Sequence, residues 1–238
     1  MLAGLPVIYG IDPFSSETEP SHQLGTIGIT TDGRKFRYVR NNVTNAAVAG
    51  ELQQSSVEDT GDQSLLMAAG SIGDRTVTTV GTVTVTANQY ADGYIVFTAE
   101  GGTGNGLYYK IKSHPAATAA AVTLTLYDAL EVAITTATQA DLIANPYNLI
   151  IQNPTTATGV VVGVAFIALP ASAYGWVQTG GPGICLSDGA TAVGAQVVAS
   201  NGTAGAVEDV ASTTQAIVGT AITGIATAEF GLVYLTLD

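Results

Sequence analysis

Short runs of alternating apolar and polar residues, rich in valine and threonine, recur along this chain between glycine-containing turns. In the run Thr82–Thr86 threonine and valine alternate, and Val233, Leu235 and Leu237 repeat the spacing near the C-terminus. Side chains on a β-strand point alternately to the two faces of the sheet, so a period of two indicates half-buried strands. The chain is therefore expected to be all-β.

Turn signals delimit the predicted strands. Asp32-Gly33 lies between two apolar runs, which is the pattern of a tight β-hairpin. Asp92-Gly93 and the glycine-rich stretch from Gly101 to Gly106 predict two further turns. Short strands separated by such turns are typical of a β-barrel or a β-sandwich.

One short helix is predicted in the second half of the chain. Thr138 has the character of an N-cap residue with Asp141 three positions later, and Asn145-Pro146 would end the helix. The fold class expected from the sequence is thus an all-β barrel or sandwich with at most one or two short helices.

The first residues are expected to form an extended N-terminal arm, because Pro6, Pro13 and Pro20 prevent a regular helix. The chain is divided on these patterns into four segments: residues 1-31 as the arm and first strand, 32-75 as a β-hairpin region, 76-170 as a central β subdomain, and 171-238 as a C-terminal β subdomain.

The second half contains an internal echo. Val162-Gly163-x-Ala165 is followed by Tyr174-Gly175-Trp176-Val177, and Val218-Gly219-x-Ala221 is followed at the same interval by Phe230-Gly231-Leu232-Val233. Each copy has the pattern of a strand, a loop and a return strand that opens with an aromatic residue and a glycine. Two interpretations stay open: a duplicated hairpin, or coincidence within a β-rich sequence.

The composition argues against several classes of function. The formal net charge of -12 opposes binding to nucleic acid. Cys185 is the only cysteine, and His22 and His114 lack the spacing of zinc ligands, so no metal or other cofactor is predicted. No apolar run approaches the roughly 20 residues that span a bilayer, so no membrane partner is expected.

No catalytic motif is present, and the chain is not expected to be an enzyme. A Gly-x-Ser-x-Gly nucleophile elbow does not occur. Gly102, Gly104 and Gly106 lie between two strand patterns instead of preceding a helix, which favours a flexible hairpin loop over a phosphate site.

Five residues are candidate contacts with a partner. Arg34, Lys35, Arg37 and Arg40 form a basic island, interpreted either as a solvated strand face or as a docking site for an acidic protein, with nucleic acid the lesser alternative. Trp176 is the only tryptophan, and a place in the core is favoured over the alternative of an interface anchor.

Several segments resemble the capsid decoration, or cement, proteins of tailed bacteriophages. They are LGTIGITTDGRKFRYVRN, ADGYIVFTAEGGTGNGLYYKIKSHP, ANPYNLII, and YGWVQTGGP followed by LSDGATAVGAQVV. The resemblance implies a β-barrel or β-sandwich protein that binds the outer surface of the capsid lattice and stabilises the shell.

The same resemblance implies the major capsid protein as partner, a homotrimer, and a place on the capsid surface of the virion after synthesis in the host cytoplasm. Two alternatives stay open. One is another virion component, such as a head fibre base or a tail-associated protein, and the other is a glycan-binding β module.

Overall fold

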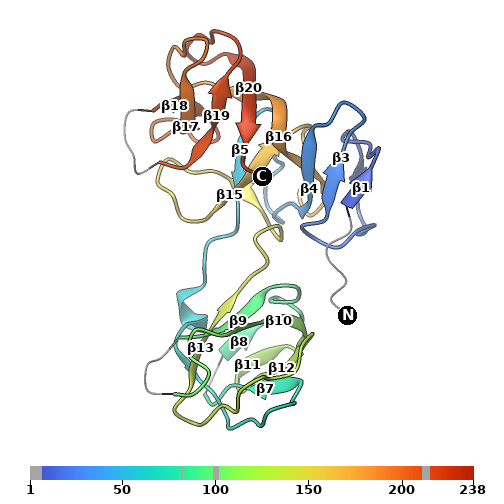
Figure 1. Cartoon of the computed structure of the whole chain (residues 1–238), viewed down its shortest axis with the longest axis vertical. Coiled ribbons are helices and arrows are strands. Elements are labelled where there is room, and N and C mark those ends of the chain that lie inside the picture. The colour runs from blue at the N-terminus through green and yellow to red at the C-terminus, as the bar shows by residue number, and fades with distance from the viewer. Residues whose placement is uncertain (1–6, 82, 99–101, 211–214) are drawn as a thin grey trace. The chain divides into compact units, whose positions relative to one another are not determined.

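A computed structural model describes residues 7–81, 83–98, 102–210 and 215–238. The chain forms two compact units (Figure 1). Unit 1 consists of Met1–Val57 and Pro146–Asp238, and unit 2 is the intervening stretch Glu58–Asn145. The expected all-β class is confirmed, since the one helical element of the described residues is the short 3-10 helix η1 (Thr60–Asp62).

Unit 1 contains a twelve-stranded sheet with the main order β1-β3-β4-β16-β20-β19-β17-β18. Every pairing between its strands is antiparallel except that of β1 with β3. Its strands are β1 (Val7–Tyr9), β2 (Ser16–Glu17), β3 (Ile27–Ile29), β4 (Lys35–Arg40), β5 (Leu52–Gln54), β14 (Ile151–Gln152), β15 (Val161–Ala165), β16 (Tyr174–Leu186), β17 (Gln196–Ala199), β18 (Val207–Asp209), β19 (Ile217–Ala221) and β20 (Phe230–Thr236).

The described part of the N-terminal arm lies on unit 1. β1 pairs with β3, and β2 pairs with β16 at Tyr174 and Gly175. The predicted hairpin joins β3 to β4, and Gly33 at its turn has φ +84°, a conformation that glycine adopts without strain. Figure 1 shows β1, β3 and β4 side by side.

The internal echo corresponds to a structural duplication within unit 1. Repeat A consists of β4, β5, β14, β15 and residues 174–178 of β16, and repeat B consists of residues 182–186 of β16 together with β17, β18, β19 and β20. Equivalent strands pair in the same register. The matched pairs are Ala165–Val177 with Ala221–Val233, Val164–Gln178 with Thr220–Tyr234, Leu52–Val164 with Gln196–Thr220, Gln54–Ile151 with Val198–Glu208, and Tyr38–Trp176 with Ile184–Leu232.

Finer features of the two repeats also match. The parallel bridge between Asn41 and Ile150 in repeat A has its counterpart between Ser187 and Val207 in repeat B. A Cβ placed on Gly175 would lie 2.8 Å from Leu169, and one on the equivalent Gly231 would meet Ile225 more closely still. Glycine at both positions therefore leaves room for a core side chain, which gives the echo a packing cause and favours duplication over coincidence.

The two repeats differ at one hairpin. In repeat B a short loop joins β17 to β18, two antiparallel strands in register. In repeat A the equivalent strands β5 and β14 pair in the same way, but the whole of unit 2 lies between them in the sequence. Unit 2 is thus inserted into a hairpin loop of repeat A.

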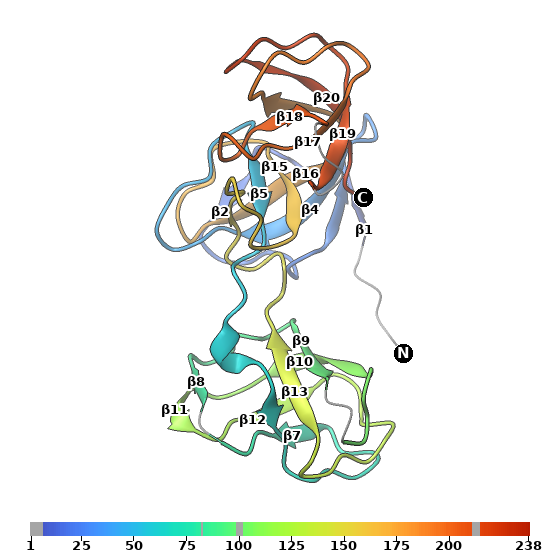
Figure 2. The same ribbon diagram turned by 90° about the vertical axis from the view of Figure 1, so that its left-hand side faces the viewer.

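Unit 2 is a smaller β-structure with its own apolar core, which includes Phe97, Ile111 and Leu124. Its main sheet has the order β6-β13-β9-β10-β12-β7, and β8 pairs with β11 (Figure 2). Its strands are β6 (Leu65–Leu66), β7 (Thr76–Thr78), β8 (Val83–Val85), β9 (Tyr94–Phe97), β10 (Tyr108–Ser113), β11 (Ala117–Ala120), β12 (Thr123–Leu126) and β13 (Gln139–Ile143).

The helix predicted from Thr138 is wrong, because this segment forms strand β13. Ala140 and Leu142 are buried, and β13 pairs with both β9 and β6. Thr138 does accept a backbone hydrogen bond, from the N–H of Thr135 at 3.1 Å, but that contact closes a turn before the strand. Pairing on both edges of β13 outweighs the local capping signal, which is compatible with either structure.

The four predicted segments divide the chain at other points than the two units do. Segment 32-75 passes from unit 1 into unit 2 at Val57, and segment 76-170 passes back at Pro146. No long glycine-rich linker marks either crossing in the sequence. The chain enters unit 2 after β5 and returns before β14, and these two strands pair with each other. Three predicted positions lie outside the described residues: Pro6 of the arm, Thr82 of the first strand pattern and Gly101 of the glycine-rich turn.

Candidate interaction surfaces

The basic island is divided by the alternation of strand β4. Lys35 and Arg37 point to one side of the strand and Arg40 to the other, while Arg34 precedes the strand. Lys35 is the exposed member, and the three arginines are half-buried. The four cations therefore do not present one continuous patch.

Two arginines of the island are held in ion pairs within the chain. Arg34 Nε lies 2.8 Å from Asp32 Oδ2. Arg37 binds both carboxylate oxygens of Asp238, at 2.6 and 2.9 Å, and donates to the carbonyl oxygen of Gly25 at 2.9 Å. Burial acts to raise the pKa of Asp238, but the hydrogen bonds and charge of Arg37 offset it, so that this pKa lies below its ordinary value.

Arg40 is held by an aromatic ring. Its guanidinium lies 5.6 Å from the centroid of Tyr174, and its buried Nε has no hydrogen-bond partner among the described residues. Docking through the basic island stays a prediction, and Lys35 is its most accessible member.

Trp176 lies in an aromatic core cluster between repeat A and the N-terminal segment. Its side chain is 4% exposed and packs against Phe36 and Tyr38, with the ring of Tyr38 at 5.1 Å between centroids. Ile11 and Leu24 of the N-terminal segment pack on the same cluster. A partner could therefore reach Trp176 only if this segment moved away.

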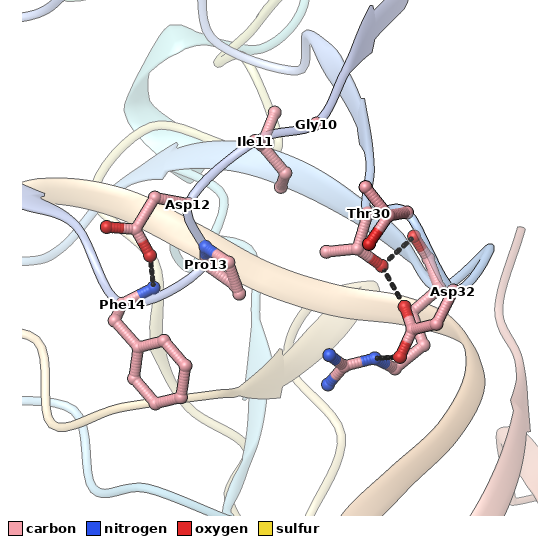
Figure 3. A pocket seen from close by; sticks show the side chains of 9 residues that line it. Gly10, Ile11, Asp12, Pro13, Phe14, Thr30 and Asp32 are labelled. Atoms are coloured by element: carbon pink, nitrogen blue, oxygen red, sulfur yellow. Dashed lines mark hydrogen bonds and ion pairs between the residues drawn. The ribbon is translucent and has the colours of Figure 1, made fainter.

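A shallow cleft of 410 Å³ lies between the N-terminal segment and the β3–β4 hairpin (Figure 3). Its lining includes Asp12, Phe14 and Arg34, and the Asp12 carboxylate accepts the backbone N–H of Phe14 at 3.0 Å. Phe14 is 67% exposed, and Tyr9, which precedes the cleft residue Gly10 in the chain, is 76% exposed. We call Tyr9, Phe14 and Arg34 the arm surface.

The arm surface is ordered by ring contacts. Phe14 meets the ring of Phe166 at 5.0 Å between centroids, and the Arg34 guanidinium lies 5.1 Å from the same ring. Phe166 thus supports an aromatic side chain and a cation that both reach solvent. Sequence reasoning identified Arg34 but missed Tyr9 and Phe14, for which their apolar character within a polar, proline-containing arm was the available signal.

A second surface lies on the outer side of repeat B. Strand β20 alternates strictly between exposed and buried residues, and its outward side chains other than Thr236 are large and mainly apolar. We call the following five side chains, which are between 40% and 52% exposed, the uncovered face: Phe230, Leu232, Tyr234, Ile184 and Ile222.

Cross-strand pairing makes the uncovered face continuous. Ile184 lies opposite Leu232 in the register of β16 and β20, and Ile222 donates its backbone N–H to Leu232. Sequence reasoning predicted the inward side of β20 and missed the outward side. A strand that is apolar on both sides indicates burial on both sides, and this was the signal.

A buried polar cluster in unit 2 was also missed. The Tyr90 hydroxyl donates to Asp62 Oδ2 at 2.5 Å, and the Tyr90 backbone N–H donates to His114 Nε2 at 3.0 Å. Burial, together with the carboxylate of Asp62, raises the pKa of Tyr90. These contacts join η1 to two loops of unit 2, which gives the cluster a structural role.

Within the described ranges, no three or more His, Cys, Asp or Glu side chains are grouped so that they could hold a metal ion. Helices in the same ranges include none long and apolar enough to cross a bilayer. Comparison with known proteins finds no matching family model, no matching curated protein and no matching solved structure.

Proposed function

We propose that the protein is a virion structural component, without catalytic activity, that binds the outer surface of a tailed-phage capsid lattice and stabilises the shell. Its partner is the major capsid protein. Its place is the capsid surface, after synthesis in the host cytoplasm.

The arm surface is the observation that carries this proposal. Aromatic side chains and arginine are enriched among the residues that dominate binding energy at protein interfaces. Phe14 is largely exposed beside Arg34 at a cleft, and Tyr9 is largely exposed next to the cleft residue Gly10, an arrangement that supports recognition of another protein. Exposed Lys35 adds a cation suited to an acidic neighbour.

The sequence resemblance described above is the reason for proposing a capsid lattice as the binding partner. A capsid lattice offers the same site many times, so a modest contact surface is sufficient when several copies bind together. An all-β scaffold that holds an aromatic surface rigid suits this role.

Binding to shells that lack the protein tests the proposal. Purified protein is added to such capsids, and bound protein is measured after sedimentation together with the temperature at which the shells open. Saturable binding at a fixed ratio and a higher opening temperature are expected. Failure to bind any form of the capsid would refute the proposed function.

Variants of the arm surface sharpen the test. Truncation of Tyr9 and Phe14 to alanine is expected to weaken shell binding by about tenfold or more for each hot-spot side chain. Val193→Ala is the control, since Val193 is 69% exposed and belongs to neither surface. Lys35→Glu is expected to lower affinity most at low salt, where charges are least screened.

A further inference from the structure

The same sheet face is buried in repeat A and partly exposed in repeat B. In repeat A, Phe36, Tyr38 and Trp176 are at most 4% exposed. The register places Ile184 and Leu232 of repeat B at the positions of Tyr38 and Trp176. These counterparts are both 40% exposed.

The difference has a visible cause, since the N-terminal segment covers repeat A. Ile11 and Leu24 pack on the aromatic cluster, and the Tyr38 hydroxyl donates to Glu17 of the segment at 2.7 Å. A Cβ added to Gly28 would lie 2.6 Å from the Trp176 ring, so this ring packs directly against the backbone of β3. Duplication thus produced two such faces. The described residues bury the first almost completely. On the second, the turn at Gly50 approaches Phe230 and Ile184 but leaves both side chains at least 40% exposed.

A strand position is also left open in repeat B. β2 pairs with β16 at Tyr174 and Gly175 in repeat A. The equivalent residues of repeat B are Phe230 and Gly231 of β20, and among the described residues β20 pairs with β16 and β19 alone. The described residues therefore place no equivalent of β2 on this edge of β20, next to the exposed apolar face.

The size of the uncovered face suits a stable contact. Five large side chains that are 40–52% exposed offer about 400 Å² of apolar surface. One side of a standard interface buries about 800 Å², of which somewhat more than half is apolar. The face alone supplies nearly all of that apolar share.

The charge of the chain favours a second copy as the partner that covers this face. The chain carries a net charge of -12, so two copies repel each other wherever carboxylates meet. All five side chains of the uncovered face are uncharged, and neighbouring outward positions are Pro182, Leu186, Thr220 and Thr236. Copies of this acidic chain can approach there without burying like charges.

We infer that the uncovered face of repeat B is the contact between copies of this chain. A second copy takes the place that the N-terminal segment takes on repeat A. The contact is separate from the arm surface, so it leaves that surface free for the partner named in the proposed function.

Light scattering on the purified full chain tests this inference. The wild-type mass is expected to be a multiple of 24.1 kDa, and Leu232→Glu is expected to return it to one chain. Ile72→Glu is the matched control, because Ile72 is an exposed apolar residue of unit 2 that is expected to tolerate the same change. Circular dichroism checks that both variants are folded.

A photo-crosslinking residue in place of Tyr234 keeps the test decisive if Leu232→Glu does not fold. Covalent multimers are expected from position 234 and not from position 9, where Tyr9 is more exposed but lies on the arm surface. A wild-type chain that stays at 24.1 kDa at all concentrations would overturn the inference, as would unchanged assembly of a folded Leu232→Glu variant. If the wild type is a single chain in solution and Leu232→Glu nevertheless abolishes shell binding, the face contacts the capsid. That result would overturn the inference and leave the proposed function intact.

Discussion

Truncation of equivalent side chains in the two repeats is predicted to have unequal costs. Trp176→Ala removes a side chain that is 4% exposed, and large-to-small changes of buried tryptophan cost about 3–5 kcal/mol. Leu232→Ala removes three carbons from a side chain that is 40% exposed, which costs about 1 kcal/mol because only the buried part loses its transfer energy.

Urea denaturation followed by far-ultraviolet circular dichroism measures both costs. Low protein concentration keeps the copies apart, so that Leu232 is tested in the isolated chain. Hydrogen exchange measured on peptides from β4 under the same conditions assigns the loss of stability to unit 1. This is needed because the two units can unfold in separate steps. Equal costs at the two positions would refute the reasoning that the N-terminal segment covers repeat A and leaves repeat B open.

Three further predictions concern the rest of the molecule. Replacement of residues 58–145 by a short glycine-serine linker is expected to leave unit 1 folded with a cooperative thermal transition, because β5 and β14 already pair as a hairpin; a chain without such a transition would contradict the insertion. The pKa of Asp238 is lowered in the folded chain, so its contribution to stability is present above its unfolded pKa of about 3.9 and is lost as pH falls through the folded value. Asp238→Asn should therefore flatten the acid limb of the stability curve, and an unchanged limb in that variant would contradict this role of Asp238. Burial raises the pKa of the Cys185 thiol to about 12, so alkylation by iodoacetamide is expected only after unfolding, and rapid labelling of the native chain would count against this burial.

The sequence predicted the elements whose signals are local. The Asp32-Gly33 hairpin and the β-branched alternation are confirmed, because turn chemistry and side-chain period act within a few residues. The pattern around Thr138 misled, because a cap-like Thr-x-x-Asp sequence also suits a turn that leads into a strand with partners on both edges.

The surfaces depended on contacts between distant residues, and the sequence alone could not supply them. Trp176 was favoured as a core residue, but nothing near it in sequence identifies Ile11 and Leu24 as the side chains that pack on its cluster. The echo identified the hairpins of both repeats. The outer strands of each repeat came only from the register, since their sequences have diverged.

The insertion of unit 2 has a consequence for the order in which the chain folds. In repeat B the β17–β18 pairing closes a loop of a few residues, whereas in repeat A the β5–β14 pairing must bring together Gln54 and Ile151. The longer loop adds about 2 kcal/mol of closure entropy if the intervening chain is unstructured. Repeat B and unit 2 are therefore expected to form early as local nuclei, and repeat A to close last around an already compact insert. During synthesis, β5 would emerge before unit 2 and wait for both of its partner strands, β14 and β15, which makes it the segment most dependent on protection from aggregation.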